Sequence, residues 1–138
     1  MEALYAEAEW IVRRATELEE QAMREGQGSY PAELHDLLAD PYLSWNQAGI
    51  QQIWELGWQQ APGESSGLIL RPQPGVRMDG SELALDACLL KTATVDAQGS
   101  VVAPSEMVRR SYFFKHVDSR LKLFTSTIGT EIEQCPFA

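Results

Sequence analysis

Asp86 and His116 are the residues whose type and position could support proton transfer. Asp86 lies in an alternating segment where Ala84, Cys88 and Leu90 are its same-face neighbours. If that face pointed inward, the carboxylate would lie among apolar groups, its pKa would rise and it could act as a general base. The opposite face makes the better core face, with Leu83, Leu85, Ala87 and Leu89. The pattern therefore favours an Asp86 that faces water.

His116 ends a stripe with Tyr112 and Phe114, next to a turn. A histidine there could shuttle protons near neutral pH, but a histidine beside a turn more often caps the rim of a sheet. We expect no metal and no cofactor, because the candidate ligands have no spacing that favours a metal site: His35, His116, Asp36 and Asp40.

Large aromatic residues gather around one segment and could line a ligand pocket: Tyr42, Trp45, Trp54 and Trp58. Aromatic side chains with polar tips are common in such pockets. They also fill the wide space between a helix and a curved sheet, which is the more frequent role and the one we favour. Trp10 lies off the apolar stripe of its segment and could contact a partner or a second copy.

The first 60 residues have helical patterns that would position these groups. An apolar stripe predicts a helix over about 2–25, ended by Gly26. Pro31 suits the first turn of a short helix over about 31–39, and Asp40-Pro41 ends it. Ser44 and Gln47 fit a capping box for a third helix over about 44–60. A loop over 61–67 follows.

From Leu68 onward the pattern has a period of two, which predicts strands over about 67–77, 82–95, 101–117 and 120–133. The last two strands form a hairpin around Asp118-Ser119. If Val117 faces Arg120, one face of this hairpin carries Tyr112, Phe114, His116, Leu121, Leu123 and Thr125, and the other Phe113, Lys115, Lys122 and Phe124. The first face is more apolar and is expected to pack inward. Helices followed by antiparallel strands predict a single α+β domain over 1–138, with the sheet curved over the helices.

The net charge is −9, and most of it lies in residues 1–40, which hold 3 basic and 10 acidic side chains. Such a surface repels nucleic-acid phosphates and anionic lipids, so we expect neither as a partner. No apolar segment approaches the ~20 residues that a membrane span needs. The first residues lack the features of a signal peptide.

Cys88 and Cys135 are the two cysteines, and their spacing alone leaves two readings open. They could be buried thiols of a cytosolic protein, which is common. They could also form a disulfide that ties the C-terminal tail to the sheet. If Asp86 faces outward, Cys88 shares its face, and the tail would cross there.

The order of elements, ending in Val117-Asp118-Ser119-Arg120-Leu121-Lys122-Leu123, resembles the cone-shaped fold of the nuclear transport factor two and SnoaL superfamily. Many members have Asp-Gly at this turn and tryptophan after the next basic residue, and this chain departs from them at Ser119 and Leu121. The resemblance is greatest to exported or lipid-anchored bacterial domains in which a third-strand cysteine pairs with one at the extreme C-terminus. It therefore implies a Cys88–Cys135 disulfide and an oxidising compartment, with an export signal missing before Met1.

This resemblance implies N-terminal helices packed in the concave face of a strongly curved antiparallel sheet, a cystatin-like cone. It leaves the function open, because the fold hosts enzymes, binding modules and interaction domains. We expect a non-catalytic exported domain that binds a small ligand or a partner protein at the cell envelope, with membrane contact only through a removed signal or lipid anchor. One alternative is an enzyme acting on a hydrophobic small molecule, similar to SnoaL or ketosteroid isomerase, with Asp86, His116 and Tyr112 as its reactive groups. Another is a structural domain that forms homodimers.

Overall fold

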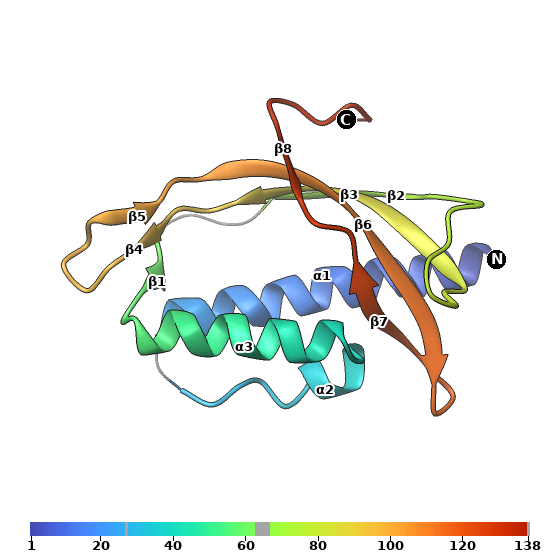
Figure 1. The fold of residues 1–138 in the computed structure, drawn as a ribbon, viewed down its shortest axis with the longest axis horizontal. Coiled ribbons are helices and arrows are strands. Elements are labelled where there is room, and N and C mark those ends of the chain that lie inside the picture. Colours follow the sequence, from blue (N-terminus) through green and yellow to red (C-terminus); the bar gives the residue numbers. More distant parts are fainter. Residues whose placement is uncertain (27, 63–66, 138) are drawn as a thin grey trace.

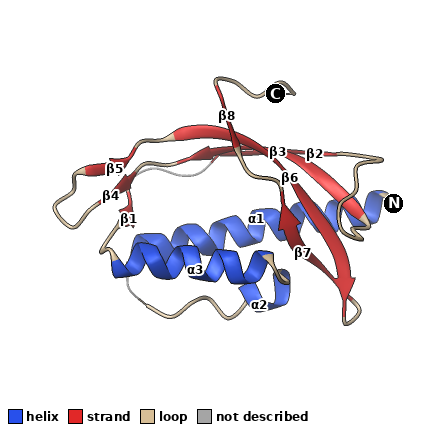
Figure 2. Ribbon diagram, viewed as in Figure 1, coloured by secondary structure: helices blue, strands red, loops and turns tan. Residues whose placement is uncertain are grey.

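The computed structural model of the chain is a mixed α+β structure, with helices on one side of antiparallel sheets (Figures 1 and 2). It describes residues 1–26, 28–62 and 67–137. Residues 63–66, which belong to the loop predicted over 61–67, lie outside the described residues. The helices are α1 (Glu2–Glu25), α2 (Leu34–Leu37) and α3 (Tyr42–Glu55). None of the described helices has the length and apolar character that a membrane span requires.

Helix α1 follows the predicted apolar stripe. Its buried side chains are Ala8, Ile11, Val12, Ala15, Leu18 and Ala22. Gly26 ends the helix with a φ of 73° and a ψ of −137°, a conformation that glycine can adopt because it has no Cβ. A Cβ at Gly26 would lie 3.0 Å from Nε2 of Gln59, the end of a flexible side chain, so the positive φ is the stronger reason for glycine.

Helix α3 begins and ends earlier than the predicted helix over 44–60. Asp40 takes the capping role that the sequence assigned to Ser44, because its Oδ1 accepts hydrogen bonds from the Ser44 backbone N–H (3.0 Å) and hydroxyl (2.6 Å). At the other end, Gly57 has a φ of 72° and the helix ends at Glu55. The helix predicted over 31–39 contains only the four residues of α2.

The main sheet has the strand order β2-β3-β6-β7, and β8 also pairs with β6. A smaller sheet has the order β1-β4-β5. The strands of the main sheet are β2 (Gly67–Pro72), β3 (Leu83–Lys91), β6 (Glu106–Val117), β7 (Arg120–Ser126) and β8 (Thr130–Ile132). The small sheet contains β1 (Gln59–Gln60), β4 (Thr94–Val95) and β5 (Val101–Ala103). Strands β3 and β6 arch over α1 and α3 (Figure 1).

Each of the four predicted strands is shortened or divided. Pro72 is the last residue of β2, and Pro104 separates β5 from β6, because proline cannot donate a ladder hydrogen bond. The segment 82–95 forms two strands, since the ladder with β6 stops at Lys91 and the chain then joins the small sheet through β4. The segment 120–133 is divided between β7 and β8.

The hairpin turn between β6 and β7 has the predicted register, with Val117 opposite Arg120. Asp118 and Ser119 both have positive φ, 51° and 69°, which fits the right-handed twist of the flanking strands. A bulge between Phe113 and Phe114 changes the register farther from the turn, so Thr125 lies opposite Phe113. The expectation that Thr125 shares a face with Phe114 is therefore wrong, because the bulge inserts one residue into β7.

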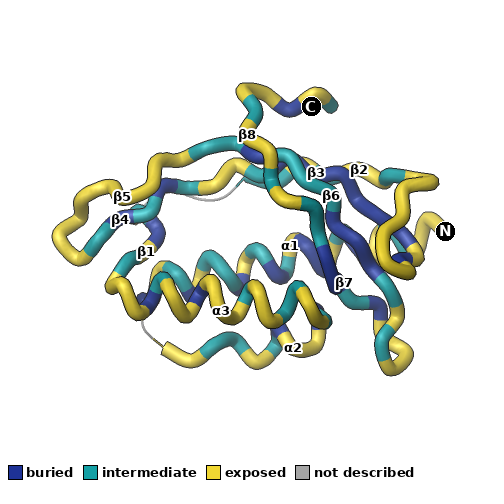
Figure 3. Tube along the Cα trace, viewed as in Figure 1, coloured by how far each residue is buried: buried dark blue, intermediate teal, exposed yellow. Residues whose placement is uncertain are grey.

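The core lies between α1, α2 and the helix-facing side of the main sheet, where dark blue segments face one another in Figure 3. The sheet contributes the following side chains: Leu83, Leu85, Ala87, Tyr112, Phe114, Leu121 and Leu123. Phe113 and Phe124 are also buried, in a second cluster with Ala84. All six residues from Leu83 to Cys88 are buried, so this part of β3 is covered on both of its faces.

Candidate functional site

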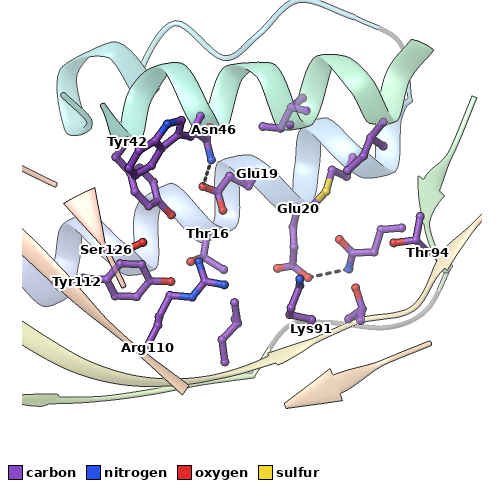
Figure 4. Close-up of a pocket in the computed structure, with 18 residues that line it drawn as sticks. Thr16, Glu19, Glu20, Tyr42, Asn46, Lys91, Thr94, Arg110, Tyr112 and Ser126 are labelled. Atoms are coloured by element: carbon purple, nitrogen blue, oxygen red, sulfur yellow. Dashed lines mark hydrogen bonds between the residues drawn. The ribbon is translucent and has the colours of Figure 1, made fainter. Parts of the chain in front are cut away.

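A cavity of about 460 Å³ lies between α1, α3 and the helix-facing side of β6 (Figure 4). Its size is in the range of pockets that hold small organic molecules. Thr16, Glu19 and Glu20 reach it from α1, and Arg110 and Tyr112 from β6. The remaining lining residues come mainly from α3 and from the strand ends near the small sheet: Met23, Tyr42, Trp45, Asn46, Gly49, Ile50, Ile53, Gln60, Leu89, Lys91, Thr92, Thr94 and Ser126.

Glu19 is the acidic group with the most perturbed titration in this cavity. Burial raises the pKa of its carboxyl to about 7, against the opposing effects of a hydrogen bond from Asn46 and of the positive charge on Arg110. Asn46 donates through Nδ2 to Oε1 of Glu19, and its Oδ1 accepts a 2.6 Å hydrogen bond from the Tyr30 hydroxyl. The three side chains form a hydrogen-bonded row that fixes the orientation of Glu19. Near neutral pH, therefore, Glu19 is present in both protonation states.

Arg110 points into the cavity toward α1 (Figure 4), and Lys91 is a second basic residue in the lining. Arg110 lies opposite Ala87 in the ladder of β6 and β3, two residues before Tyr112 on the same face of the strand. Its Nε is buried, and no acceptor among the described residues lies within hydrogen-bond distance of that atom. A Cβ at residue 129 would lie 2.8 Å from Nη2 of Arg110, so Gly129 lets the backbone pass close to the guanidinium. The cavity thus contains a fixed positive charge with unused donor capacity.

Two tyrosines place their rings beside this charge. Tyr42 and Tyr112 pack edge to face, with ring centroids 6.2 Å apart. Burial raises the pKa of Tyr112 to about 12 and raises the pKa of Tyr42 well above its ordinary value. Both hydroxyls therefore remain protonated at physiological pH and can donate hydrogen bonds.

The part of the cavity formed by α3 is more apolar. Ile50 and Ile53 line it, and Trp45 lines it while keeping 57% of its surface exposed. Gly49 is exposed on the same helix, and a Cβ placed there would meet no atom within 4 Å. Trp45 and Gly49 therefore lie at the mouth of the cavity.

Of the four predicted pocket aromatics, the structure brings Tyr42 and Trp45 to the cavity. Trp54 is instead buried against α1, where its Nε1 donates a 3.1 Å hydrogen bond to the carbonyl of Ala22. Trp58 follows α3, is half-buried and lies outside this lining. Trp54 therefore fills space between packed elements, which is the alternative role that the sequence analysis gave for these aromatic residues.

The structure does not bring Asp86, His116 and Tyr112 together. Asp86 lies on the face opposite Tyr112, because its strand neighbours Leu85 and Ala87 point to the helices. It is only 2% exposed, so the expectation that it faces water is wrong: the guanidinium groups of Arg71 and Arg109 cover it. The Arg109 guanidinium, followed by that of Arg71, lowers the pKa of this carboxyl, opposite to what a catalytic base requires.

His116 lies at the rim of the sheet, next to the hairpin turn. Its Nδ1 is 3.0 Å from Oε1 of Glu82, and its backbone N–H donates to the other carboxylate oxygen. This backbone hydrogen bond is the main cause of a lowered pKa of Glu82. The side chain is 40% exposed, as the rim-capping interpretation predicts. Metal-binding groups of three or more acidic, histidine or cysteine side chains are absent from the described part of the chain.

The predicted disulfide between Cys88 and Cys135 is confirmed, with Cα atoms 5.9 Å apart. It lies on the face of the sheet away from the helices, where β8 leads into the C-terminal segment (Figure 1). Phe137 packs there, with its ring centroid 4.2 Å from the guanidinium carbon of Arg71. The tail therefore covers the outer face of β3. This agrees with the expectation that the tail crosses the face that Cys88 shares with Asp86.

Sequence reasoning missed Glu19 and Arg110, two of the four charged side chains that line the cavity. Arg110 could have been found, because the stripe Tyr112, Phe114 and His116 places it on the inward face when extended back by two residues. Glu19 lies between Ala15 and Ala22 at helical spacing, at the border of the apolar stripe. Nothing in α1 alone distinguishes it from the solvated glutamates nearby.

No family model matches the sequence, and no curated protein matches it. Among solved structures, the chain is similar to the intermembrane space region of the chloroplast protein ARC6, with a TM-score of 0.65. The two share 17% sequence identity, and the similarity covers 88% of this chain and 93% of that chain. At this level of identity the likeness shows a common fold.

Proposed function

We propose that this protein is a non-catalytic binding domain of an exported or envelope compartment, and that the cavity between α1, α3 and β6 is its binding site. The observation that carries the proposal is the cavity itself, about 460 Å³ in volume with an exposed mouth at Trp45 and Gly49. A small ligand or a side chain of a partner protein would enter there. The few polar groups at its inner end would orient the bound group.

Two observations support a location outside the reducing cytosol. The Cys88–Cys135 disulfide is of a kind that persists in oxidising compartments. The fold neighbour is described as a region of an intermembrane space, which is consistent with an envelope location. Mass spectrometry of the protein under denaturing, non-reducing conditions tests this part. A mass two hydrogens short of the dithiol, with a cross-linked peptide pair, is expected, whereas two free thiols in protein isolated from its native compartment would contradict it.

The proposal also assigns the chain to the cone-shaped superfamily of nuclear transport factor two. The arching of β3 and β6 over α1 and α3 supports this assignment (Figure 1). In such a cone, the pocket between the helices and the concave face of the sheet is the usual place for a ligand. The position of the present cavity agrees with that expectation.

Substitution of Gly49 by phenylalanine tests the binding site. The new ring would occupy the mouth, and the open space around the Cβ position means that the fold should tolerate it. The probe is N-phenyl-1-naphthylamine, a neutral apolar dye whose fluorescence rises on binding. We expect Gly49→Phe to weaken dye binding about tenfold or more.

Gln52→Phe is the matched control, because it adds the same ring to an exposed position of α3 outside the cavity lining. This variant should bind the dye as the wild type does. Equal loss in both variants, or wild-type affinity in Gly49→Phe, would contradict the proposed site. Cooperative thermal unfolding of each variant ensures that a molten state is not responsible for dye fluorescence.

A second candidate function is an enzyme similar to SnoaL or ketosteroid isomerase. The observation that favours it is Glu19, whose pKa of about 7 suits a general base or acid, beside the buried hydroxyl donors Tyr42 and Tyr112. In this reading Glu19 replaces Asp86 and His116 as the acid–base group. Solvent-deuterium exchange at the α-carbon of a bound cyclic ketone such as 2-tetralone, lost in Glu19→Gln, would favour it. Absence of exchange with a ketone that binds would count against it.

A further inference from the structure

We propose that the cavity selects monoanionic aromatic or alicyclic acids, with Arg110 as the group that binds the carboxylate or sulfonate. The proposal rests on the binding function proposed above and names its ligand class. It follows from the charge, the donors and the apolar surface that meet in the cavity.

The side chain of Arg110 is half-buried, and its Nε is fully buried. A guanidinium buried in protein is normally paired with a carboxylate or with several acceptors, because an uncompensated buried charge is costly. No salt bridge joins Arg110 to an acidic side chain of the described residues, and its buried Nε lacks an acceptor among them. By contrast, its neighbour Arg109 donates from Nε and Nη2 to Asp86 on the other face. The Nε side of this guanidinium lies beside Gly129, and Figure 4 shows the guanidinium extending into the cavity, where a ligand oxyanion could accept hydrogen bonds from it.

Neutral hydrogen-bond donors surround the charge of Arg110. The hydroxyl-bearing side chains Thr16, Tyr42, Tyr112 and Ser126 line the cavity with Arg110. Figure 4 shows Tyr112, Ser126 and Thr16 around the guanidinium. Because both tyrosines stay protonated, they can donate to an oxyanion without adding negative charge. These groups suit one planar or tetrahedral oxyanion at the inner end of the cavity.

The apolar part of the cavity would hold the body of the ligand. From the oxyanion position, the cavity continues toward Ile50, Ile53 and the exposed ring of Trp45. An aromatic or alicyclic ring system would bury its surface there. A volume of about 460 Å³ accommodates a body of two or three rings.

Two carboxylates on α1 limit the ligand to a single negative charge. Glu19 and Glu20 border the cavity on α1, and Gln60 donates a 2.9 Å hydrogen bond to Glu20. A second anionic group would lie close to these carboxylates and would be repelled. Lys91 also lines the cavity, but its Nζ is 3.9 Å from Oε1 of Glu106 and is partly neutralised by it.

The protonation of Glu19 links ligand affinity to pH. The groups facing Glu19 are Asn46 from α3, Arg110 and Tyr112 from β6, and the hydroxyls of Tyr30 and Tyr42. Arg110 is the only one of these five that carries a charge at neutral pH. When Glu19 is ionised, its charge opposes an anion bound by Arg110, so affinity for an anion should fall as pH rises through about 7.

A matched pair of dyes tests the proposal. The anionic dye is 8-anilinonaphthalene-1-sulfonate, and the neutral dye is N-phenyl-1-naphthylamine, which is the same ring system without the sulfonate. We expect Arg110→Gln to weaken binding of the anionic dye about tenfold or more while changing neutral-dye affinity less than about twofold. Arg110→Lys keeps the charge and should recover part of the lost affinity. Equal effects on both dyes, or no effect on either, would overturn the proposal.

The pH series is the second measurement and uses the wild type and Glu19→Gln, so it does not depend on the folding of an Arg110 variant. The charges of both dyes are constant between pH 6 and pH 8. Wild-type affinity for the anionic dye should fall about fivefold over this range, neutral-dye affinity should stay constant, and Glu19→Gln should remove the dependence. A flat wild-type profile for the anionic dye would overturn the coupling of Arg110 and Glu19.

The two proposals fail in different ways. If the neutral dye binds in a manner sensitive to Gly49→Phe and the anionic dye shows no dependence on Arg110, the binding site stands and the ligand class is wrong. If neither dye responds to Gly49→Phe, the proposed binding site itself is wrong.

Discussion

Asp86 and Arg109 form an ion pair across neighbouring strands, with Oδ2 of Asp86 2.8 Å from Nη2 of Arg109. Arg71 approaches the same oxygen from the other neighbouring strand, at 3.0 Å. The carboxylate is 2% exposed, and Phe137 of the tail packs over both guanidinium groups. This charge cluster and the disulfide beside it explain why Asp86 and Cys88, on the outer face of β3, are as buried as Leu85 and Ala87 on its inner face.

Replacing Asp86 by asparagine should destabilise the fold, because it removes the charge that two close arginines share. We expect a loss of about 2 kcal/mol in the free energy of unfolding, less than for a fully enclosed ion pair because both arginines are partly exposed. Urea denaturation measures it. Asp36→Asn is the matched control, since its pair with Arg120 is exposed on both sides and should contribute no more than about 0.5 kcal/mol. Equal effects of the two substitutions would contradict the structural role of Asp86.

The raised pKa of Glu19 predicts how stability depends on pH. The folded state holds the Glu19 proton up to about pH 7, whereas an unfolded chain releases it near 4.5. The folded state therefore binds more protons between these values, and stability falls as pH rises through this window. The loss should be about 2 kcal/mol between pH 5 and pH 8. Asp86, with its lowered pKa, loses its contribution only as the pH falls through the acid range, below this window.

Glu19→Gln is the variant that isolates this effect. Glutamine can still accept the hydrogen bond from Asn46 but does not titrate. Its unfolding free energy should be nearly constant between pH 5 and pH 8, measured by urea denaturation at each pH. Parallel profiles for the wild type and Glu19→Gln would show that Glu19 is not the titrating group.

The hairpin turn offers a stabilising substitution. Ser119 has a φ of 69°, and left-handed backbone costs a residue with a Cβ roughly 1 kcal/mol relative to glycine. Ser119→Gly should therefore raise the unfolding free energy by about 0.5–1 kcal/mol, seen as a higher midpoint of thermal unfolding. Ser100→Gly is the control, because Ser100 is exposed beside a turn without a positive φ and should gain nothing. A lower midpoint for Ser119→Gly would contradict the turn geometry.

Local sequence patterns predicted the presence of the helices and strands more accurately than the residues at which they begin and end. The stripe of α1 specified a helix because burial of one face repeats at helical spacing. The ends of α3 depended on Asp40 and on a left-handed Gly57, and the sequence offered Ser44 as an equally good cap. The bulge at Phe113 and Phe114 depends on how β7 packs, so no alternation pattern could place it. These details are decided by tertiary contacts rather than by propensity.

The candidate site was harder to predict than the fold. The correct face of Asp86 followed from alternation, but its burial depends on Arg71 and Arg109, whose positions opposite Asp86 and Cys88 require the strand register. Glu19 became part of a cavity only because β6 arches over α1 (Figure 1). A pocket formed between distant elements leaves no signal in either element alone.

Mapping of the neutral dye by nuclear magnetic resonance tests most directly whether the cavity between α1, α3 and β6 is the binding site. N-phenyl-1-naphthylamine is titrated into isotopically labelled protein, and shifts of amide and side-chain methyl signals are recorded. We expect saturable shifts at Gly49, Ile50, Ile53, Thr94 and Tyr112, with little change at the exposed Trp10. Shifts centred on Trp10 or on the outer face of β3, with none in the cavity, would contradict the account.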